Sequence, residues 1–444
     1  MIQIALLLFG ADFVRTKSKY LWFIGFLWGI AGGLIFIDGL DGQLYFPLKT
    51  FGFFLILESL ITLSVASSGV GTQKAVLYFK GGIFFFSALI IIVNQAYSNL
   101  LLSIIFGFAY FIIGLFVSVS AWIVRFPRWQ TAAFYGLVQI IFAFFLFIHY
   151  QATISFFLGF FMIDSGFSCL KMAKRTSQMK RATSVFQLMQ PTDLLLYKSA
   201  KKSQEKTEAL TAENTVPSLS PSLIVHIWTP EGSASNRPVP RPVINRYIAA
   251  VDENGVISTG HAALEVSPDV YISLYPAEDL DRSPSEFFRL LKATRDNDVK
   301  GIFQPSYAVE SAKWCDSDRR IRFRDYNFEA LSNFWQSYRR EDTYNLTYRN
   351  CSSSVAYALE AALDGVLSQR SKNWLTAFKV FFMPELWIAA QVRKRALMMA
   401  WTPGLVMDYA RALRAIVHPV SQPWHQRMPW KARETRQNNP QEKE

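Results

Sequence analysis

The sequence predicts a multi-domain membrane protein, in which an all-α bundle of six transmembrane helices precedes an α+β domain with a small antiparallel sheet. The chain has 444 residues, too many for one small core. Up to about Met172 it is almost continuously apolar, whereas the later residues carry the ordinary charge of a soluble protein. Short runs rich in β-branched and aromatic residues then follow residue 221, and such runs are typical of strands.

Six apolar runs are long enough to cross a bilayer, which requires roughly 20 helical residues. Glycines in the first run permit close packing against another helix. The preceding stretch, IQIALLLFGADFV, is too short to span and lacks the basic start of a signal peptide, so we expect an interfacial or re-entrant segment. The predicted spans are residues 20–40, 46–67, 75–94, 100–124, 129–150 and 152–172.

Positive charges alternate between the two sides of these spans. They occur before the first span, between the second and third, between the fourth and fifth, and after the sixth, while the opposite loops contain little beyond Lys49. By the positive-inside rule, both ends of the chain face the cytoplasm. The residues that set this orientation are Arg15, Lys17, Lys19, Lys74, Arg125, Arg128, Lys171, Lys174, Arg175, Lys180 and Arg181.

Three carboxylates lie near the ends of apolar runs: Asp38 in LIFIDGL, Glu58 in LILESL and Asp164 in FFMIDSGF. Ionisable groups at membrane depth are costly, so these residues either serve a function, such as transport, or cap helices and pair inside the bundle. No basic partner is evident at matching depth. Over residues 21–172, the six runs and this repeated element resemble the HdeD-type acid-resistance membrane proteins. The resemblance implies a bacterial inner (cell) membrane location.

The formal charge of +12 suggests attraction to anionic lipid, because the Lys and Arg residues flank apolar runs or lie in linkers and tails. No basic groove interleaved with aromatic residues is present, so we expect no nucleic-acid partner. The cysteines, Cys169, Cys315 and Cys351, are too few and scattered for a disulfide framework or a zinc site. We therefore expect neither a metal nor a cofactor, and the oligomeric state stays open.

Composition divides the chain further. Residues 173–221 are rich in Lys, Glu, Ser and Thr, the signature of a disordered linker. After the α+β domain, NWLTAFKVFFMPELWIAAQVRKR predicts either an interfacial membrane element or a segment packed on that domain. The predicted organisation is 1–172 membrane domain, 173–221 linker, 222–367 α+β domain, 368–415 amphipathic helical extension and 416–444 disordered tail.

Strand signals open the α+β domain in PSLIVHIWTP, VINRYIAAVD, VISTGHAALEV and DVYISLYP, with a hairpin turn at DENG and another turn at VSPD. Helices are predicted at SPSEFFRLLKAT and NFEALSNFWQSYRR, with the strand RRIRFRDY between them. A last helix begins in YRNCSSSVAYALE, where Asn350 is a good N-cap and Gly365 ends the helix.

Cys351 therefore falls in a first helical turn, where free backbone N–H groups and the helix dipole stabilise a thiolate. A thiol nucleophile requires a general base, for which histidine is suited near neutral pH. Among the five histidines, His261 follows a glycine in a strand expected to be central, whereas His226 is expected in an outer strand as a structural histidine. The alternative is that Cys351 is a small buried hydrophobe. The serines Ser352–Ser354 lack a GxSxG elbow and are expected to complete the cap and supply polar surface.

A strand histidine followed by an Asn-Cys helix start resembles circularly permuted papain-like enzymes, the NlpC-related and lecithin:retinol acyltransferase-like group. The matching phrases are GHAALEV…YISLYP and YNLTYRNCSSSVAYALE, and the likeness covers residues 223–367. It implies that Cys351 is the nucleophile and His261 the base. The family's third polar residue, often His, Asn or Gln, falls on Ser273, with Tyr275 as a fallback and Glu265 too far along its strand.

The expected function is that of a membrane-anchored thiol hydrolase, whose cytoplasmic Cys/His domain cleaves a peptide or isopeptide amide bond through an acyl-enzyme. Two alternatives remain open at this point: a lipid acyltransferase or acyl hydrolase of the same fold, and a non-catalytic scaffold in a membrane stress response. The expected partners are the lipid bilayer and a peptide, isopeptide or lipid acyl substrate.

Overall fold

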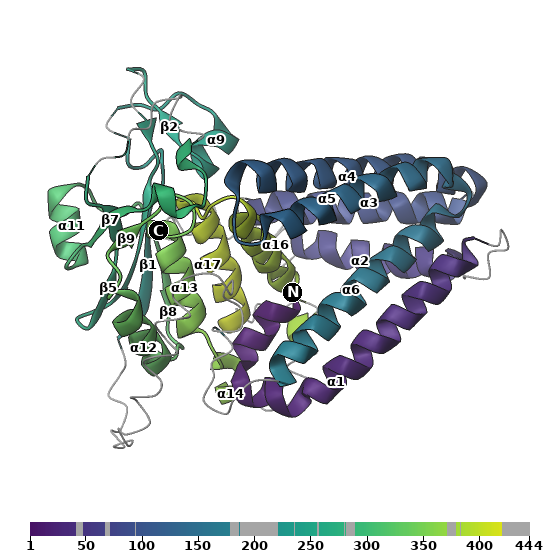
Figure 1. Cartoon of the computed structure of the whole chain (residues 1–444), viewed down its shortest axis with the longest axis horizontal. Coiled ribbons are helices and arrows are strands. Elements are labelled where there is room, and N and C mark those ends of the chain that lie inside the picture. Colours follow the sequence, from purple (N-terminus) through teal and green to yellow (C-terminus); the bar gives the residue numbers. More distant parts are fainter. Residues whose placement is uncertain are drawn as a thin grey trace, which may run out of the picture. The chain divides into compact units, whose positions relative to one another are not determined.

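The structure, a computed structural model, describes residues 1–40, 48–66, 72–93, 95–177, 186, 221–234, 236–254, 257–278, 280, 289–370, 379–381 and 383–419. These residues are mostly helical, with small antiparallel sheets (Figure 1). The chain separates into two compact units. Unit 1 holds Met1–Phe13, Ile123–Trp129 and Lys180–Pro419, and unit 2 holds Val14–Trp122 and Gln130–Met179. Most of the predicted linker and the tail from residue 420 lie outside the described residues.

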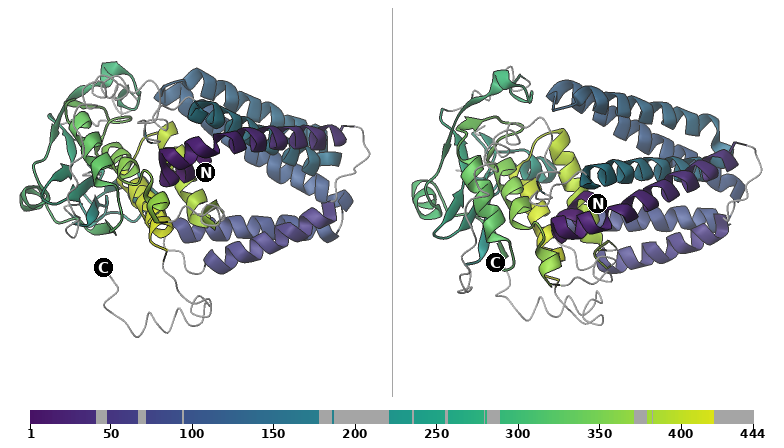
Figure 2. Two further views of the ribbon diagram at one scale, coloured as in Figure 1. Left: turned by 90° about the horizontal axis from the view of Figure 1, so that it is seen from below. Right: turned by 60° about the horizontal axis from the view of Figure 1, so that its bottom comes forward.

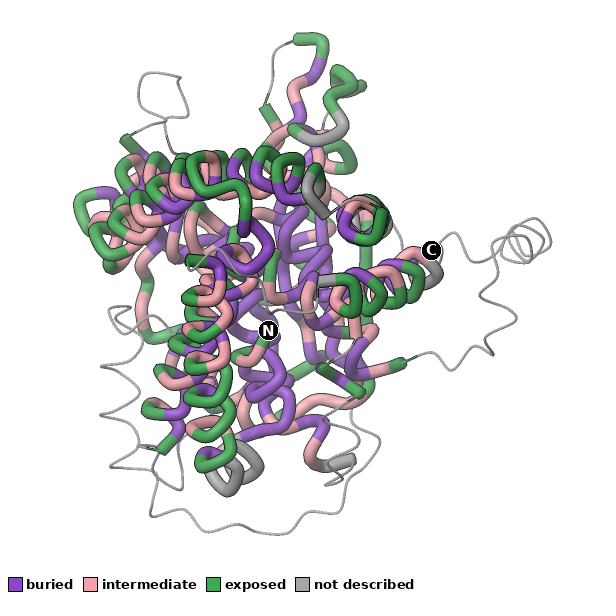
Figure 3. Tube along the Cα trace, turned by 90° about the vertical axis from the view of Figure 1, so that its right-hand side faces the viewer, coloured by how far each residue is buried: buried purple, intermediate pink, exposed green. Residues whose placement is uncertain are grey.

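Unit 2 consists of helices, and each predicted apolar run falls on one of them. Within the described residues, four segments are long and apolar enough to cross a membrane: Ser18–Asp38, Asn99–Val124, Trp129–Ile148 and Tyr150–Ser177. Many of their apolar residues are exposed, and exposed residues give the green segments that recur along the helical tubes in Figure 3. The helices are α1 (Ile2–Asp38), α2 (Leu48–Ala66), α3 (Thr72–Val93), α4 (Gln95–Val124), α5 (Trp129–Ile148) and α6 (Thr153–Ser177), with a 3₁₀ turn η1 (Tyr150–Ala152) before α6.

Glycines allow the helices of unit 2 to approach closely, as the sequence suggested. A Cβ atom added to Gly166 of α6 would lie 2.8 Å from the backbone nitrogen of Gly29 in α1. The expectation that the carboxylates of the apolar runs have no basic partner is wrong for Glu58. Its Oε1 atom lies 2.5 Å from Nζ of Lys80 on α3. This ion pair favours a structural role for Glu58.

The main sheet of unit 1 has the strand order β5-β4-β1-β8 and is antiparallel throughout. Its strands are β1 (Leu223–Trp228), β4 (His261–Val266), β5 (Val270–Ile272) and β8 (Arg319–Phe323). β1 pairs with β4 so that Trp228 faces His261 and His226 faces Ala263. Because paired residues share a face, both histidines lie on the same side of the sheet. In this strand order β1 lies between β4 and β8, so it is an inner strand. The expected outer position of His226 is therefore wrong.

Smaller elements surround this sheet: α9 (Pro242–Tyr247), η2 (Arg295–Asn297), α11 (Tyr307–Lys313), α12 (Phe328–Tyr338) and the strands β2 (Ala250–Val251), β3 (Ile257–Ser258), β6 (Leu274–Pro276), β7 (Val299–Phe303) and β9 (Thr343–Tyr344). α9 corrects the predicted strand VINRYIAAVD. A proline at the first helical position suits a helix start, and Arg246 and Tyr247 bind Asp408 at 2.6 and 2.9 Å. The predicted helix SPSEFFRLLKAT falls mainly outside the described residues.

Two helices, α13 (Cys351–Ala362) and α17 (Pro403–Val417), pack on the main sheet. α14 (Val366–Arg370) follows α13 in the chain, and α16 (Pro384–Met398) packs against α17. α13 contacts β4 and α17, and α17 contacts α16, so the three helices lie side by side (Figure 2, green to yellow). Of the two alternatives for the extension after residue 367, packing on the α+β domain therefore describes α16 and α17.

The first turns of α1, for which an interfacial or re-entrant position was expected, belong to unit 1. Side chains from Ile4 to Phe9 are buried, and the N–H of Gly365 donates to the carbonyl of Leu7 at 2.9 Å. Gly10 then bends the chain, with φ 76° and its added Cβ only 2.7 Å from the Cα of Gly365. Only glycine meets both demands without strain.

A buried ion pair joins the extension to α13. Arg393 of α16 binds Glu360 of α13 through Nε at 2.7 Å and Nη2 at 3.3 Å, and Tyr409 of α17 donates to the same carboxylate at 2.9 Å. The Glu360 and Arg393 side chains are 0% and 6% exposed. Removing one partner from such a pair leaves an uncompensated charge in the core.

We expect Arg393→Ala to lower the free energy of unfolding of unit 1 by about 3–5 kcal/mol, because Glu360 would lose its counter-ion. Urea denaturation of the full chain in detergent, followed by tryptophan fluorescence, measures this loss. The matched control is Lys394→Ala, which removes an exposed charge from the next position. Equal stability of the two variants would contradict the role given to the ion pair.

Candidate active site

Cys351 is the first residue of α13, and its backbone is held by a complete capping box. Oδ1 of Asn350 accepts the N–H of Ser353, and Oγ of Ser353 accepts the N–H of Asn350, both at 2.8 Å. The Asn350 amide also donates to the carbonyls of Leu346 and Trp401 at 2.7 and 3.0 Å. The cap uses the Ser353 N–H, which leaves the Cys351 and Ser352 N–H groups without an intrahelical acceptor.

The residue before the cap is equally fixed. Arg349 is buried and donates to the carbonyls of Tyr338, Glu341 and Thr343, each at 2.8 Å. Ser352, Ser353 and Ser354 are buried too, so the expectation that they supply polar surface is wrong, although Ser353 does complete the cap. The entry to α13 is therefore a rigid, hydrogen-bonded turn.

His261 begins β4 and meets the thiol there. Cys351 and His261 line one cavity, and the proximity of the imidazole is felt at the thiol as a lowered pKa. Nε2 of His261 lies 2.8 Å from Oγ of Ser273 and 3.3 Å from Oε1 of Glu310. With Nε2 engaged on that side, Nδ1 is the ring nitrogen that serves the thiol.

Three sequence-predicted site residues, Cys351, His261 and Ser273, are thus brought together. Tyr275, the fallback, stacks on the His261 ring with centroids 4.2 Å apart and donates to Glu310 at 2.8 Å. Glu310 itself was missed from the sequence. It lies on α11, which follows β7, and neither its segment YAVESAK nor its distance along the chain marks it as a neighbour of His261.

A cavity of about 260 Å³ opens at the thiol. Its lining includes the aromatic rings of Tyr275, Trp314 and Tyr344, the hydroxyls of Ser233, Ser258 and Thr259, and the carboxylate of Asp252. The imidazole and the sulfur therefore face a small space of mixed character. It is smaller than the 300–1,000 Å³ common for ligand pockets.

Opposing effects set the protonation of Cys351. Burial raises the pKa of the thiol, but the charge and hydrogen bond of His261, with contacts to Ser352 and the Ala262 backbone, outweigh it and hold the pKa below its ordinary value. Cys315 differs, because burial and the negative charges of Asp318 and Asp316 raise the pKa of its thiol. The two cysteines should thus react in different pH ranges.

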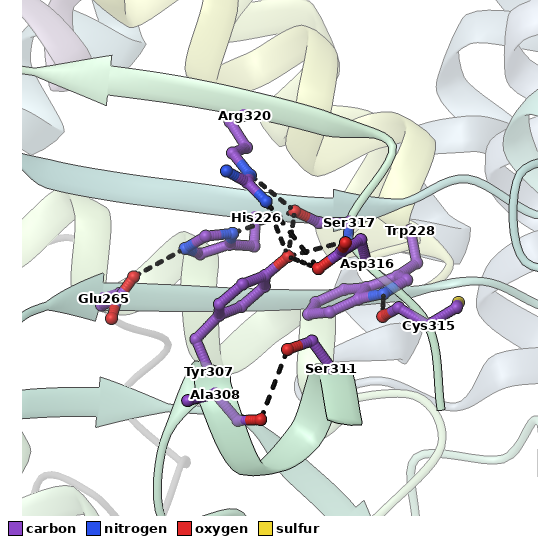
Figure 4. Close-up of polar contacts among 10 residues, drawn as sticks. All are labelled: His226, Trp228, Glu265, Tyr307, Ala308, Ser311, Cys315, Asp316, Ser317 and Arg320. Atoms are coloured by element: carbon purple, nitrogen blue, oxygen red, sulfur yellow. Dashed lines mark hydrogen bonds and ion pairs between the residues drawn. The ribbon is translucent and has the colours of Figure 1, made fainter. Parts of the chain in front are cut away.

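His226 lies on the same sheet face but in an enclosed network (Figure 4). Its Nε2 binds Glu265 at 2.9 Å, its Nδ1 binds Ser317 at 3.0 Å, and its ring stacks on Tyr307 with centroids 4.1 Å apart. Burial lowers the pKa of His226 despite the Glu265 hydrogen bond. This environment fits the structural role that was expected for His226. Glu265, which was considered too far from His261 to orient it, instead binds His226.

Within the described residues, no cluster of His, Cys, Asp or Glu could hold a metal ion. Comparisons of the chain with protein-family models, curated proteins and solved structures found no match. The likenesses to HdeD-type proteins and to permuted papain-like enzymes stay predictions from the sequence motifs.

We expect Cys351 to be alkylated by iodoacetamide with a pH profile that levels off below the ordinary thiol pKa of about 8.5, because only the thiolate reacts. Cys315 should instead continue to gain reactivity above that pH. Isotope-coded labelling of the full chain, read by mass spectrometry, compares both thiols in one sample. His261→Ala should move the Cys351 profile to higher pH, since the largest of the effects that oppose burial is then lost. A Cys351 profile at or above that of Cys315 would refute the assignment.

Proposed function

We propose that this protein is a membrane-anchored thiol hydrolase that cleaves an amide bond through an acyl-enzyme, with Cys351 as nucleophile and His261 as general base. The single observation that carries the proposal is the Cys351 thiol at a capped helix start, which lines one cavity together with His261. The resemblance of this domain to permuted papain-like enzymes, carried by the sequence motifs, supports the same chemistry.

In the first half-reaction, Sγ of Cys351 attacks the carbonyl carbon of the amide and forms the sulfur–carbon bond. The N–H groups of Cys351 and Ser352 form part of the positive end of the α13 dipole. There they stabilise the negative charge that develops on the carbonyl oxygen of the substrate. His261, protonated by the thiol, then gives that proton to the leaving nitrogen as the carbon–nitrogen bond breaks. An amine leaves and a thioester remains.

In the second half-reaction, His261 takes a proton from water, whose oxygen attacks the thioester carbonyl. The carbon–sulfur bond breaks, the acid is released, and the thiolate is restored beside the imidazole. Ser273 holds Nε2 through its hydroxyl group, 2.8 Å away, and so directs Nδ1 toward the thiol in both steps.

The cavity favours a compact, polar acyl group. Hydroxyl groups and one carboxylate share its wall with aromatic rings. Hydrogen bonds and ring stacking suit a peptide-like or isopeptide substrate better than a long hydrocarbon chain. Transfer to or from a lipid acyl group is the second candidate, favoured by the apolar helices that bring the same chain into contact with lipid.

The membrane part is proposed to be an HdeD-type domain with six spans in a bacterial inner membrane, and both termini in the cytoplasm. Support comes from the four long apolar helices and from the basic residues that flank them on one side. The membrane part would then anchor the hydrolase at the cytoplasmic surface.

We expect Cys351→Ala and His261→Ala to lower kcat/KM for a fluorogenic aminoacyl or isopeptide amide by roughly 10⁴-fold or more, the scale seen when a nucleophile or its base is removed. The purified full chain in detergent is the material, and release of the fluorophore is the readout. Cys315→Ala, which removes the other thiol of unit 1, should retain activity. If both catalytic variants keep full function in cells, the enzyme proposal fails and a non-catalytic scaffold remains.

A further inference from the structure

We infer that Glu310 is the positioning residue for His261: it fixes the imidazole and balances its positive charge, in place of the charged or amide group that Ser273 lacks. This inference rests on the proposed thiol chemistry. Glu310 lies on α11, whereas the third polar residue of the site was expected on the strand that follows His261.

Glu310 is nearly inaccessible, with 3% of its surface exposed, and its carboxylate is surrounded by donors. Oε1 accepts from the Tyr275 hydroxyl at 2.8 Å and lies 3.3 Å from Nε2 of His261, and Oε2 accepts from the Tyr271 hydroxyl at 2.6 Å. The Oγ atom of Ser273 lies 2.8 Å from the same Nε2 of His261. The carboxylate of Glu310 therefore reaches the imidazole directly, next to the Ser273 hydroxyl group.

The negative charge of Glu310 affects which of Cys351 and His261 holds the proton. When His261 holds the proton of the thiol, the imidazolium lies between the thiolate on one side and the Glu310 carboxylate on the other. In a buried setting these attractions are stronger than in water. Glu310 thus favours the ion pair of Cys351 and His261 over the neutral pair, and it holds the proton on Nε2 in the neutral tautomer.

The position of Glu310 depends on the anchoring of α11. Tyr307, three residues earlier on this short helix, stacks on His226 and accepts hydrogen bonds from Arg320 at 2.9 Å and from the Ser317 N–H at 3.1 Å (Figure 4). The Tyr307 hydroxyl in turn donates to Asp316 at 2.9 Å. The enclosed network around His226 therefore holds the start of the helix that carries Glu310.

The test compares Glu310→Gln with Glu265→Gln in the purified full chain. Both changes remove a carboxylate that binds Nε2 of a sheet histidine, but only Glu310 serves the histidine that faces the thiol. We expect Glu310→Gln to shift the midpoint of the Cys351 alkylation profile to higher pH by about one unit, so that alkylation at a pH below both midpoints slows by roughly tenfold. Glu265→Gln should leave the Cys351 profile unchanged. Glu310→Asp, which keeps a carboxylate, should shift the profile less than Glu310→Gln does.

The outcomes separate the two proposals. If Cys351 of the unaltered protein titrates as an ordinary thiol, the proposed hydrolase itself fails. If the unaltered protein has the low-pH profile and Glu310→Gln keeps it, only the role of Glu310 is refuted. Should Glu310→Gln fail to fold, Tyr275→Phe decides: it keeps the stacked ring, removes one donor to Glu310, and is expected to give a smaller shift in the same direction. An unchanged profile in Tyr275→Phe would then overturn the inference.

Discussion

The contact between the start of α13 and the start of β4 is the constraint on which the proposed chemistry depends. A thiol at a helix terminus gains from the helix dipole, but burial opposes its ionisation, and the imidazole decides the balance. Both partners are therefore held on their backbone. The capping box and Arg349 fix the helix entry, while the Glu360–Arg393–Tyr409 cluster fixes the same helix near its far end. For this reason α16 and α17 are part of the structure that positions the thiol, and not a separate appendage.

Two histidines on one sheet face show how surroundings assign different roles to the same side chain. Each has a carboxylate at Nε2. The second nitrogen of His226 is taken by Ser317 under the ring of Tyr307, whereas that of His261 is directed to a thiol beside a cavity. A histidine with both nitrogens satisfied by fixed partners adds rigidity, and one with a reactive neighbour can exchange a proton. The first supports the helix that carries the carboxylate of the second.

Local patterns predicted much of this arrangement. The Asn-Cys helix start and the inner strand with His261 follow from capping preferences and strand alternation, which act over a few residues. Ser273 was placed beside His261 by the resemblance to permuted papain-like enzymes, and the 2.8 Å contact agrees with that position. Glu310 could not be predicted, because tertiary packing of a short helix brings it to His261 from far along the chain. For the same reason, the β-branched residues of 243–252 suggested one long strand, whereas Pro242 and the contacts to Asp408 favour α9 and only Ala250–Val251 form a strand, β2. The apolar segment before Gly10 suggested a lipid interface, and its side chains are buried within unit 1.

That apolar segment has a topological consequence. Ile4–Phe9, the α4–α5 connection within Ile123–Trp129 and the sheet domain all belong to unit 1, although apolar helices separate them along the sequence. A chain that leaves an aqueous compartment and returns to it traverses the bilayer an even number of times. If the apolar helices cross a bilayer as proposed and unit 1 lies on one side of it, the number of crossings before residue 123 is even, and so is the number between residues 129 and 180.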